Sequence, residues 1–496
     1  MTMPLPLPPE VRDLAISIEK TARSVGLDFF PVFFEMVTYE QMNMLAAYDG
    51  FPIRYRHWKW GAEYERISKS YTYGLSKIYE LVINTNPCYA YLLEPNSVLE
   101  HKLVIAHVFA HCDFFKNNAW FSKTDRKMLD QMANHASKIA RIAETVGQER
   151  VESFIDVILT IDNLIDPYAP HIVRKREQDE EALAASLEPT RLPARSYMDR
   201  YINPTEEIEK RRDELRKKHE EQRKKLPSEP ERDVMHFLLE YAPLERWQQQ
   251  ILAMLRDESY YFVPQRMTKI MNEGWASYWH SKILTEHGVC DDSDIVDFCT
   301  VHSATMAMSP TSLNPYKIGL ELYRDIEDRW NRGRFGLEYE RCENMEEKLH
   351  WDKQLGLGRE KIFSVRKIYN DLMFVDEFLT PDFAERLKLF SYNFNRKHER
   401  WEIKTREFEQ VKTMLMKQLT NFGQPVICVE DANYKNRGEL LLWHKADGQD
   451  LKVDYARETL ANMVSLWSRP VHIRTTSEGK SVVWSHDGSR FDETRA

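Results

Sequence analysis

The sequence has no long apolar run and few cysteines, and both absences narrow the classes of protein it can encode. No stretch approaches the roughly 18 apolar residues of a transmembrane helix, so we expect no membrane span. The Pro-rich residues 1–9 lack the cationic stretch and apolar core of a signal peptide. The six cysteines never occur at C-x-x-C spacing, which excludes a zinc ribbon or a redox pair and suits a reducing compartment. Together these absences predict a cytoplasmic protein.

The chain also lacks an excess of basic residues. Its 69 lysines and arginines are outnumbered by 78 aspartates and glutamates, which gives a net charge of −9. Because no strongly basic segment stands out, we expect no nucleic-acid partner. What the chain does have is length and apolar content: 496 residues, 42% of them hydrophobic and 12% aromatic. That is enough for a sizeable core and for more than one domain.

Helical periodicity dominates the chain before residue 396. Apolar residues recur at helical spacing over 9–25. Two apolar runs, 79–84 and 88–93, flank a turn at Asn86-Pro87 and predict a β-hairpin. Asn96 or Ser97 then caps a helix that extends to about Lys116. Further helices are predicted at 38–48, within 125–167, and at 234–259, 264–284, 291–308, 315–330 and 358–392.

Two segments depart from this pattern. Residues 205–233 are almost wholly charged, which favours a solvated helix or flexible insertion over a partner-docking arm. From residue 396 the order β-α-β-β-α-β-β predicts a small C-terminal α/β sandwich. We therefore predict a mainly helical α+β protein with a body of 1–395 and a domain of 396–496. The elements predicted in that domain are 401–408, 409–422, 425–430, 439–444, 453–466, 471–475 and 481–484.

Two short motifs carry most of the chemical information. His107 and His111 are four residues apart on a predicted helix, so both imidazoles can reach one metal ion. Glu273, on a second predicted helix, supplies a third ligand. His280 follows seven residues later on the same face, and it either replaces Glu273 as ligand or orients it. The pattern predicts Zn²⁺ or another divalent cation, whereas the competing interpretation makes these histidines ordinary core groups.

This ligand set resembles that of zincin-type peptidases, but their catalytic glutamate is missing. Val108 stands where those enzymes have the Glu of H-E-x-x-H. A relocated base would come from another element, with Glu258 the leading candidate, followed by Asp257 and Glu63. A hairpin leading directly into the helix with the His pair is also similar to zincins. We therefore predict a zincin-like body in which the usual base has moved or is lost.

Two further residues follow Glu273 in a zincin-like order. His302 and Tyr316 correspond to the His and Tyr that stabilise the oxyanion in several such enzymes. We therefore assign both to the candidate catalytic site. The alternative is that residues 314–316 cap a helix and that the tyrosine ring only packs.

Candidate substrate-binding residues lie in three places. Arg54, Arg56 and His57 form a basic cluster that suits an anionic group such as a peptide carboxylate. Tyr89 lies on the predicted strand 88–93, along which an extended substrate would bind. Asn117 follows the His-pair helix and offers its amide to a substrate backbone. The alternatives are an internal interface for the basic cluster and a helix cap for Asn117.

Several longer motifs identify a family. The runs AHVFAHCDFFKNNAWF (106–121) and YYFVPQRMTKIMNEGWASYWH (260–280), with FPIRYRHWKWGAEYE, LNPYKIG and RWNRGRFGLE, resemble the stage V sporulation protein R (SpoVR) family. One departure is Ala110, where the family often has Gly. The resemblance implies a cytoplasmic bacterial protein of a family named for spore cortex formation. It also implies a genetic association with a PrkA-type serine protein kinase and its von Willebrand-like companion.

Two functional hypotheses follow from the motifs. The first is a metal-dependent hydrolase that acts on a peptide or a peptidoglycan-precursor amide. The second is a non-catalytic peptide-binding or scaffold protein that acts with the PrkA-type kinase system. The array of His, Glu and Tyr favours the first hypothesis, and Val108 favours the second.

Overall fold

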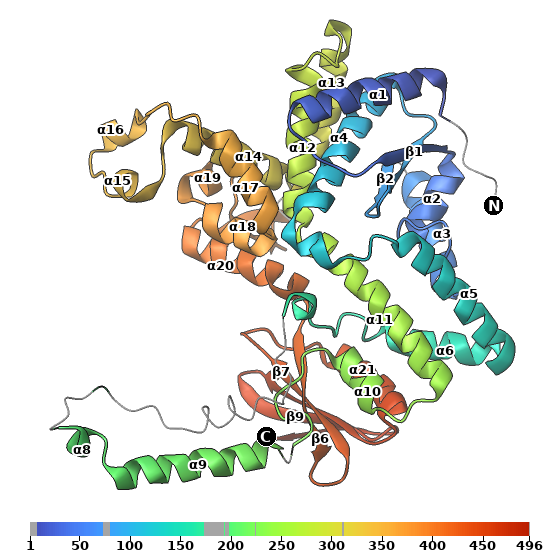
Figure 1. Cartoon of the computed structure of the whole chain (residues 1–496), viewed down its shortest axis with the longest axis vertical. Coiled ribbons are helices and arrows are strands. Elements are labelled where there is room, and N and C mark those ends of the chain that lie inside the picture. Colours follow the sequence, from blue (N-terminus) through green and yellow to red (C-terminus); the bar gives the residue numbers. More distant parts are fainter. Residues whose placement is uncertain are drawn as a thin grey trace. The chain divides into compact units, whose positions relative to one another are not determined.

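The protein consists of two compact units, each assembled from two separate stretches of chain (Figure 1). Unit 1 comprises Met1–Val151 and Tyr260–Gly423, and unit 2 comprises Glu152–Ser259 and Gln424–Ala496. The predicted division into 1–395 and 396–496 does not coincide with this one. The computed structural model describes residues 7–72, 80–172, 193, 198–223, 225–309 and 312–495.

The expected mainly helical α+β class is confirmed, with helices outweighing three small sheets among the described residues. None of the described helices combines the length and the apolar composition needed to cross a membrane.

Unit 1 contains a three-stranded sheet with the order β1-β3-β2, made of β1 (Val32–Val37), β2 (Glu80–Ile83) and β3 (Cys88–Leu93). The predicted hairpin is confirmed, since β2 and β3 pair antiparallel. The sequence patterns did not reveal β1, which pairs parallel with β3. β3 is therefore the central strand, and its nearly continuous burial is typical of a strand covered on both faces.

The helix α4 (Val98–Asn117) is the core element of unit 1. It begins at Ser97, whose hydroxyl accepts a hydrogen bond from Glu100 N while the Glu100 carboxylate accepts one from Ser97 N. Every residue from 104 to 115 is buried, so this stretch has no solvent-facing side. α4 packs against the sheet, α1 (Pro9–Ser24) and α12 (Lys269–Thr285) (Figure 1). The polar residues on this stretch therefore need partners within the core.

On another side, α12 packs closely against α14 (Pro315–Arg332). The two helices touch at Gly274 and Gly319, where backbone meets backbone without a side chain between. The remaining elements of unit 1 are α2 (Tyr39–Ala47), α3 (Trp58–Thr72), α5 (Met128–Val146), α13 (Ile295–Thr305), α15 (Gly336–Glu340), α16 (Met345–Leu349), α17 (Gly358–Ile368), α18 (Asp371–Phe378), α19 (Pro381–Arg386), α20 (Phe408–Leu419), and the paired strands β4 (Ser391–Asn395) and β5 (Arg400–Thr405).

Unit 2 is built on a five-stranded sheet with the order β10-β9-β8-β7-β6. The helix α21 (Val453–Trp467) connects the parallel strands β7 and β8 and buries Leu460, Met463 and Leu466. The sheet strands are β6 (Val426–Tyr434), β7 (Glu439–Lys445), β8 (Val471–Ser477), β9 (Lys480–His486) and β10 (Phe491–Arg495). The other α-helices in the described part of unit 2 are α8 (Asp199–Ile202), α9 (Thr205–Arg223) and α10 (Val234–Tyr241). The division between the units falls within α6 (Gln148–Leu159) and α11 (Arg246–Met267).

The predicted C-terminal sandwich needs one correction. Its first strand and first helix correspond to β5 and α20, and both belong to unit 1. β5 pairs with β4, and Val411 and Leu415 of α20 are buried in the main core of unit 1. The five-stranded sheet begins only with β6, so the C-terminal α/β layer is shorter than predicted and includes the unpredicted strand β10.

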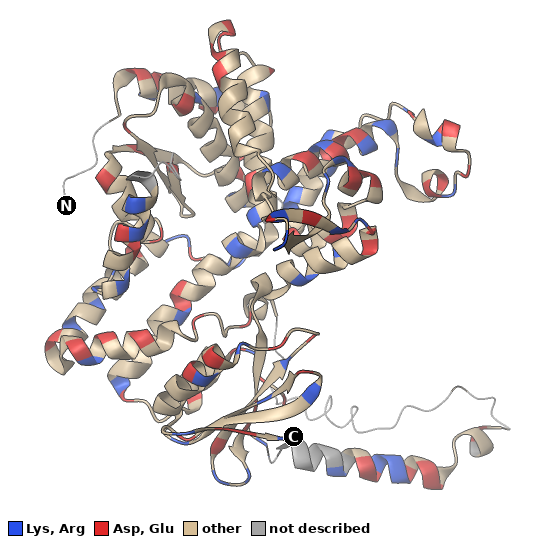
Figure 2. Cartoon of the chain, turned by 180° about the vertical axis from the view of Figure 1, so that it is seen from behind, with Lys and Arg blue, Asp and Glu red and all other residues tan. Residues whose placement is uncertain are grey.

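The charged segment 205–233 is a helix over most of its length. Basic and acidic residues are interspersed along the described part of α9, seen as blue and red segments of the ribbon in Figure 2. The end of the segment differs, because Asp233 is buried, caps α10 and forms an ion pair with Arg256. Glu231 also exchanges backbone hydrogen bonds with Val429. The boundary of the solvated insertion therefore lies before these residues.

We expect α9 to be dispensable for folding. Replacing residues 205–223 by a Gly-Ser linker of about ten residues, which can span the helix length of about 28 Å, should change the free energy of unfolding by less than about 0.5 kcal/mol. Asp233→Ala should instead cost about 2–3 kcal/mol, since Arg256 then loses a partner whose side chain is 1% exposed. Thermal unfolding of both variants would measure this contrast, and equal losses would mean that α9 packs on unit 2.

Candidate metal centre

Two histidines of α4 and a glutamate of α12 converge within the core of unit 1. His107, His111 and Glu273 each present one ligand atom, and these atoms all lie within 4.8 Å of one another. Glu273 Oε2 is 3.4 Å from His107 Nε2 and 3.5 Å from His111 Nε2. Ligand bonds of about 2.05 Å at tetrahedral angles place donor atoms about 3.3 Å apart, so the spacing fits one shared ion. The metal itself stays a prediction.

The protonation states of His107 and Glu273 suit ligand chemistry. Burial lowers the pKa of His107 to about 4, and His111 nearby adds to the effect, so His107 is neutral at pH 7. Burial raises the pKa of Glu273, but His111 and Lys269 outweigh it and hold that pKa well below its usual range. Lys269 Nζ lies 2.5 Å from Glu273 Oε1. A neutral imidazole and an ionised carboxylate are the forms that bind a divalent cation. Burial lowers the pKa of His111, but Glu273 outweighs it and holds that pKa above its usual value, so His111 must release a proton when it binds a cation.

Neighbouring side chains fix the orientation of both imidazoles. Asn272 Oδ1 lies 2.9 Å from His111 Nδ1, so it accepts the Nδ1 proton and directs the Nε2 lone pair toward Glu273. His280 Nδ1 lies 2.8 Å from His107 Nδ1, the nitrogen that faces away from Glu273. His280 was predicted either to replace Glu273 as a ligand or to orient it. Its position favours an orienting role, but the residue that it orients is His107.

The two predicted oxyanion-stabilising residues occupy different places. Tyr316 lies at the centre: in addition to burial, Glu273 is close enough to raise the pKa of its hydroxyl, and its ring is 6.3 Å from the His107 ring. Burial raises the pKa of Tyr316, so its hydroxyl is a donor at neutral pH. His302 lies one residue further out, 3.2 Å from His280 Nε2. Asn314 caps α14, as the alternative interpretation of residues 314–316 predicted. This cap does not conflict with the position of Tyr316 near the candidate ligands.

The predicted bases lie on α3 and α11, and a further carboxylate that we did not predict, Glu80, interacts electrostatically with His111. Val108 is fully buried among apolar groups. Glu63 is paired with Arg66 on α3, whereas Asp257 is exposed and Glu258 is buried on the part of α11 assigned to unit 2.

Glu80, the first residue of β2, is the second carboxylate near the His pair. Its charge interacts with His111, Glu273 and Tyr316. The residue is partly exposed, but burial of the carboxylate raises its pKa to about 7, with His111 opposing the rise and Glu273 adding to it. Local periodicity placed Glu80 correctly in a strand. The sequence does mark Glu80 in one way: it is a single charged residue directly before the apolar residues 81–83 of the same strand.

The predicted substrate strand is not at an edge. β3 lies between β1 and β2, so both of its sides already pair with strands, and Tyr89 packs against Phe33 with ring centres 5.7 Å apart. An extended peptide can add only to an unpaired edge. Within the described sheet, the edge next to the candidate centre is β2, which carries Glu80.

The other predicted substrate residues fall into two groups. Arg54, Arg56 and His57 line one common cavity on unit 1, together with residues of α2 and α3. Asn117 instead serves the fold, because its Nδ2 donates hydrogen bonds to Asp28 O at 2.7 Å and to Asp113 O at 2.8 Å. The cap-like alternative therefore describes Asn117 better than substrate binding does.

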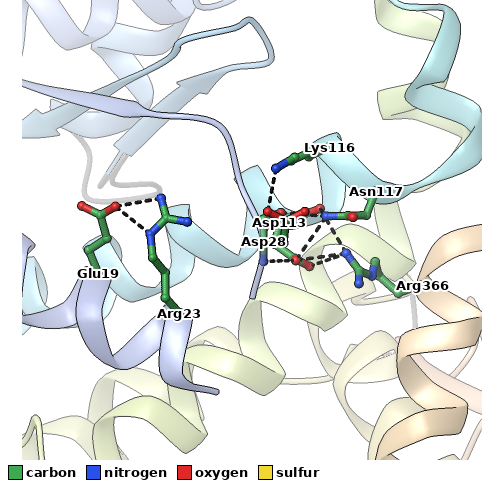
Figure 3. Close-up of polar contacts among 7 residues, drawn as sticks. All are labelled: Glu19, Arg23, Asp28, Asp113, Lys116, Asn117 and Arg366. Carbon is green, nitrogen blue, oxygen red and sulfur yellow. Dashed lines mark hydrogen bonds and ion pairs between the residues drawn. The ribbon is translucent and has the colours of Figure 1, made fainter. Parts of the chain in front are cut away.

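A buried ion pair joins α17 to α4, the helix that carries the His pair. Arg366 Nη1 of α17 is 3.0 Å from both carboxylate oxygens of Asp113, two residues after His111 (Figure 3). The indole of Trp275 donates a 2.8 Å hydrogen bond to Asp113 Oδ2, which ties α12 to α4. Burial raises the pKa of Asp113 to about 6, although Arg366 opposes the rise. This network fixes the relative position of the helices that carry the His pair and Glu273.

Comparisons with known proteins agree with the motifs. The family model described as "SpoVR like protein" matches residues 8–424, and the model "SpoVR-like C-terminal domain" matches residues 425–478. The chain is 28% identical to "Uncharacterized protein YcgB" of Escherichia coli (strain K12), over 94% of this chain and 91% of that protein. No solved structure matches the chain. With family models covering residues 8–478 almost without a break, the chain belongs to the SpoVR family.

Proposed function

We propose that unit 1 binds one divalent cation, Zn²⁺ first among them, through His107, His111 and Glu273. The observation that carries the proposal is the donor spacing of 3.4 and 3.5 Å around Glu273 Oε2, close to the value of about 3.3 Å for ligands of one tetrahedral ion. Three protein ligands leave a fourth coordination position for water or substrate. Catalytic zinc sites have this arrangement, whereas structural zinc sites have four protein ligands.

We further propose that the site is that of a zincin-like amide hydrolase with a relocated base. A cation held there would supply Lewis acidity toward an amide carbonyl and a nearby water. Glu80 would take the proton of the attacking water, since a carboxylate with a pKa of about 7 exchanges protons readily at neutral pH. The Tyr316 hydroxyl would donate to the developing oxyanion. His280 would keep the His107 ring oriented.

The substrate class follows from the edge strand. A peptide or peptidoglycan-precursor chain that pairs with β2 would pass the Glu80 carboxylate. One of its backbone amides would then lie next to the proposed base. A role in spore cortex formation and a partnership with a PrkA-type kinase and its von Willebrand-like companion are implied by family resemblance alone and stay predictions.

The non-catalytic alternative makes a different prediction for the same residues. A peptide-binding scaffold needs an intact groove and no base, and Val108 in place of the usual glutamate is the observation in its favour. Under that hypothesis, His107→Ala should impair binding of a peptide or kinase-system partner, and no variant should affect turnover.

The test is metal analysis combined with turnover by the purified full-length protein. We expect about one divalent ion per chain after reconstitution with Zn²⁺ or Mn²⁺, strong loss of that ion in His107→Ala, and retention in Glu80→Gln. Hydrolysis of a quenched-fluorescence peptide library or a peptidoglycan-precursor pentapeptide should fall about 10²-fold or more in Glu80→Gln. Glu63→Gln, on an exposed ion pair, is the matched control.

Each outcome has a distinct meaning for the proposal. A wild-type protein that stays metal-free after reconstitution with either ion would refute the metal centre. Normal turnover in Glu80→Gln would remove Glu80 from the mechanism and leave the centre in place. Stoichiometric metal without hydrolysis of either substrate would replace the hydrolase by the binding protein.

A further inference from the structure

The two-stranded ribbon of β4 and β5 in unit 1 has an exposed apolar face. Phe394 is opposite Trp401 and Tyr392 is opposite Ile403, so all four side chains share one face of the ribbon. Phe394, Trp401 and Ile403 are 48%, 44% and 41% exposed, and the rings of Phe394 and Trp401 lie 5.4 Å apart. A cluster of large exposed apolar side chains usually marks a surface that packs on something else.

The same ribbon carries unpaired positive charge. Between residues 391 and 406, five lysines and arginines outnumber two glutamates, although the whole chain has a net charge of −9. Arg396 and Lys397 follow β4, and Lys404 lies on β5. Among the described residues, none forms an ion pair or hydrogen bond with the side chains of these three, which we call the ribbon cations. Their charge is therefore available to an acidic partner.

A cavity with an acidic rim lies at α15 and α16, on the periphery of unit 1 beyond α14 and α17 (Figure 1). Leu337 and Trp351 are among its lining residues, and Leu337 is 65% exposed. Its volume of about 400 Å³ is in the range of pockets that enclose small organic molecules, which are larger than one aromatic side chain. Met345 and Leu349 of α16 are 77% and 71% exposed, so the surface around the cavity is also partly apolar.

The charge of this region is opposite to that of the ribbon. Between residues 336 and 352, six aspartates and glutamates outnumber two lysines and arginines. Glu347 lines the cavity, and Glu346 precedes it on α16. Neither carboxylate forms an ion pair with a residue in the described part of the chain. Unit 1 thus has two exposed surfaces, one aromatic and basic, the other hollow and acidic.

We propose that the β4–β5 ribbon of one copy of the protein docks on the α15–α16 cavity of a second copy. Trp401 enters the cavity and contacts Leu337 and Trp351, while the ribbon cations face Glu347 and its neighbours. Both surfaces are exposed in the single chain, so neither covers the other within one copy. The contact joins two different surfaces and is therefore heterologous, which leaves a free ribbon and a free cavity on an open dimer.

Sedimentation velocity of the full-length protein tests the proposal, in a reducing buffer because Cys342 lines the cavity. One ribbon in one cavity is a small interface, so we expect self-association with a Kd of about 1–100 µM, measured at chain concentrations up to about 1 mM. Raising NaCl from about 0.05 to about 0.5 M should weaken it severalfold, because salt screens the charges of the rim. The proposal is independent of the metal, so His107→Ala should associate as the wild type does.

Variants at exposed positions identify the two surfaces. Trp401→Ala and Leu337→Arg should each weaken self-association by about tenfold or more, as loss of a central contact does. Lys404→Glu, which changes no apolar contact of the ribbon, should weaken it severalfold and guards against local unfolding in Trp401→Ala. Tyr455→Ala removes an aromatic side chain that is 68% exposed and lies in neither surface, and it is the matched control.

Mixing two variants tests the head-to-tail geometry. Trp401→Ala keeps an intact cavity and Leu337→Arg keeps an intact ribbon, so an equimolar mixture should form a 1:1 complex with the affinity of the wild type and no larger species. A wild type that stays monomeric over the whole concentration range would overturn the proposal, as would self-association that neither variant weakens. A mixture that associates no better than its separate components would also overturn it.

Discussion

Arg366→Met is expected to lower the free energy of unfolding of unit 1 by about 3–5 kcal/mol. The side chains of Arg366 and Asp113 are 3% and 0% exposed, so the substitution removes the counter-ion of a carboxyl group that is enclosed in the core. Trp275 Nε1 and the backbone N–H of Asp28 still donate to Asp113, but neither carries a charge. Chemical denaturation followed by tryptophan fluorescence would measure the loss.

Two comparisons isolate the buried charge as the cause. Arg386→Met breaks an ion pair with Asp325 in which Arg386 is 56% exposed, so it should cost less than about 1 kcal/mol. The double variant Arg366→Met with Asp113→Asn removes the stranded charge and should recover much of the lost stability. If the double variant is no more stable than Arg366→Met alone, lost packing rather than uncompensated charge is responsible.

The penalty of Arg366→Met should also depend on pH, and its sign follows from the pKa of Asp113. That pKa is raised to about 6 in the folded protein and rises further without the cation of Arg366. A carboxyl with a raised folded pKa binds its proton more tightly when folded, so its contribution to stability is present at low pH and lost as pH increases. The penalty should therefore be smaller at pH 5 than at pH 8.

Sequence patterns succeeded where a feature depends on neighbours along the chain. The helix from Ser97 followed from a cap and an apolar run, and the structure has both. Spacing of i and i+4 placed His107 and His111 on one face of α4, and the glutamate of α12 lies opposite them. The His pair needs only helical geometry, which can be inferred from local sequence, whereas Glu273 was predicted from the ligand set that the motif resembles.

Long-range pairing could not be inferred in the same way. Nothing local in β3 says that β1, more than fifty residues earlier, pairs along its second side. That pairing makes β3 the central strand and leaves β2, which carries Glu80, at the edge of the sheet. The same reason explains β5, whose alternation predicted a strand but not its partner β4. It also explains why residues 152–259 share a unit with the C-terminal strands.

Prolines illustrate how tertiary context decides between equal local signals. The predicted helix 234–259 breaks into α10 and α11 around Pro243, which cannot supply a backbone N–H. Pro264, by contrast, lies inside α11, although the sequence pattern predicted it as the first residue of a separate helix over 264–284. There Thr268 Oγ1 donates a 2.7 Å hydrogen bond to Pro264 O within the buried core. Packing around Thr268 thus accommodates a proline inside the helix.

The same change, glycine to alanine, should have opposite effects at two helical positions. A Cβ at Gly274 would overlap the backbone of Gly319 and lie 2.8 Å from Leu320 N, so α12 and α14 would have to separate. We expect Gly274→Ala to cost about 3 kcal/mol or more, at the upper end of overpacking effects. At Gly61 of α3 the space around a new Cβ is open, and Gly61→Ala should stabilise by about 0.5–1 kcal/mol through helix propensity.

Gly274→Ala also tests whether the metal centre depends on the helix crossing. Gly274 directly follows Glu273, so moving α12 away from α14 shifts the Glu273 carboxylate relative to the His pair on α4. Ligand distances tolerate only a few tenths of an ångström, and the variant should therefore lose its bound ion under conditions in which it is still folded. Metal analysis and circular dichroism on the same sample would separate the two losses. If Gly274→Ala gains stability as Gly61→Ala does, the contact of α12 with α14 is looser than described. In that case the position of Glu273 beside His107 would have no support from the packing of α12.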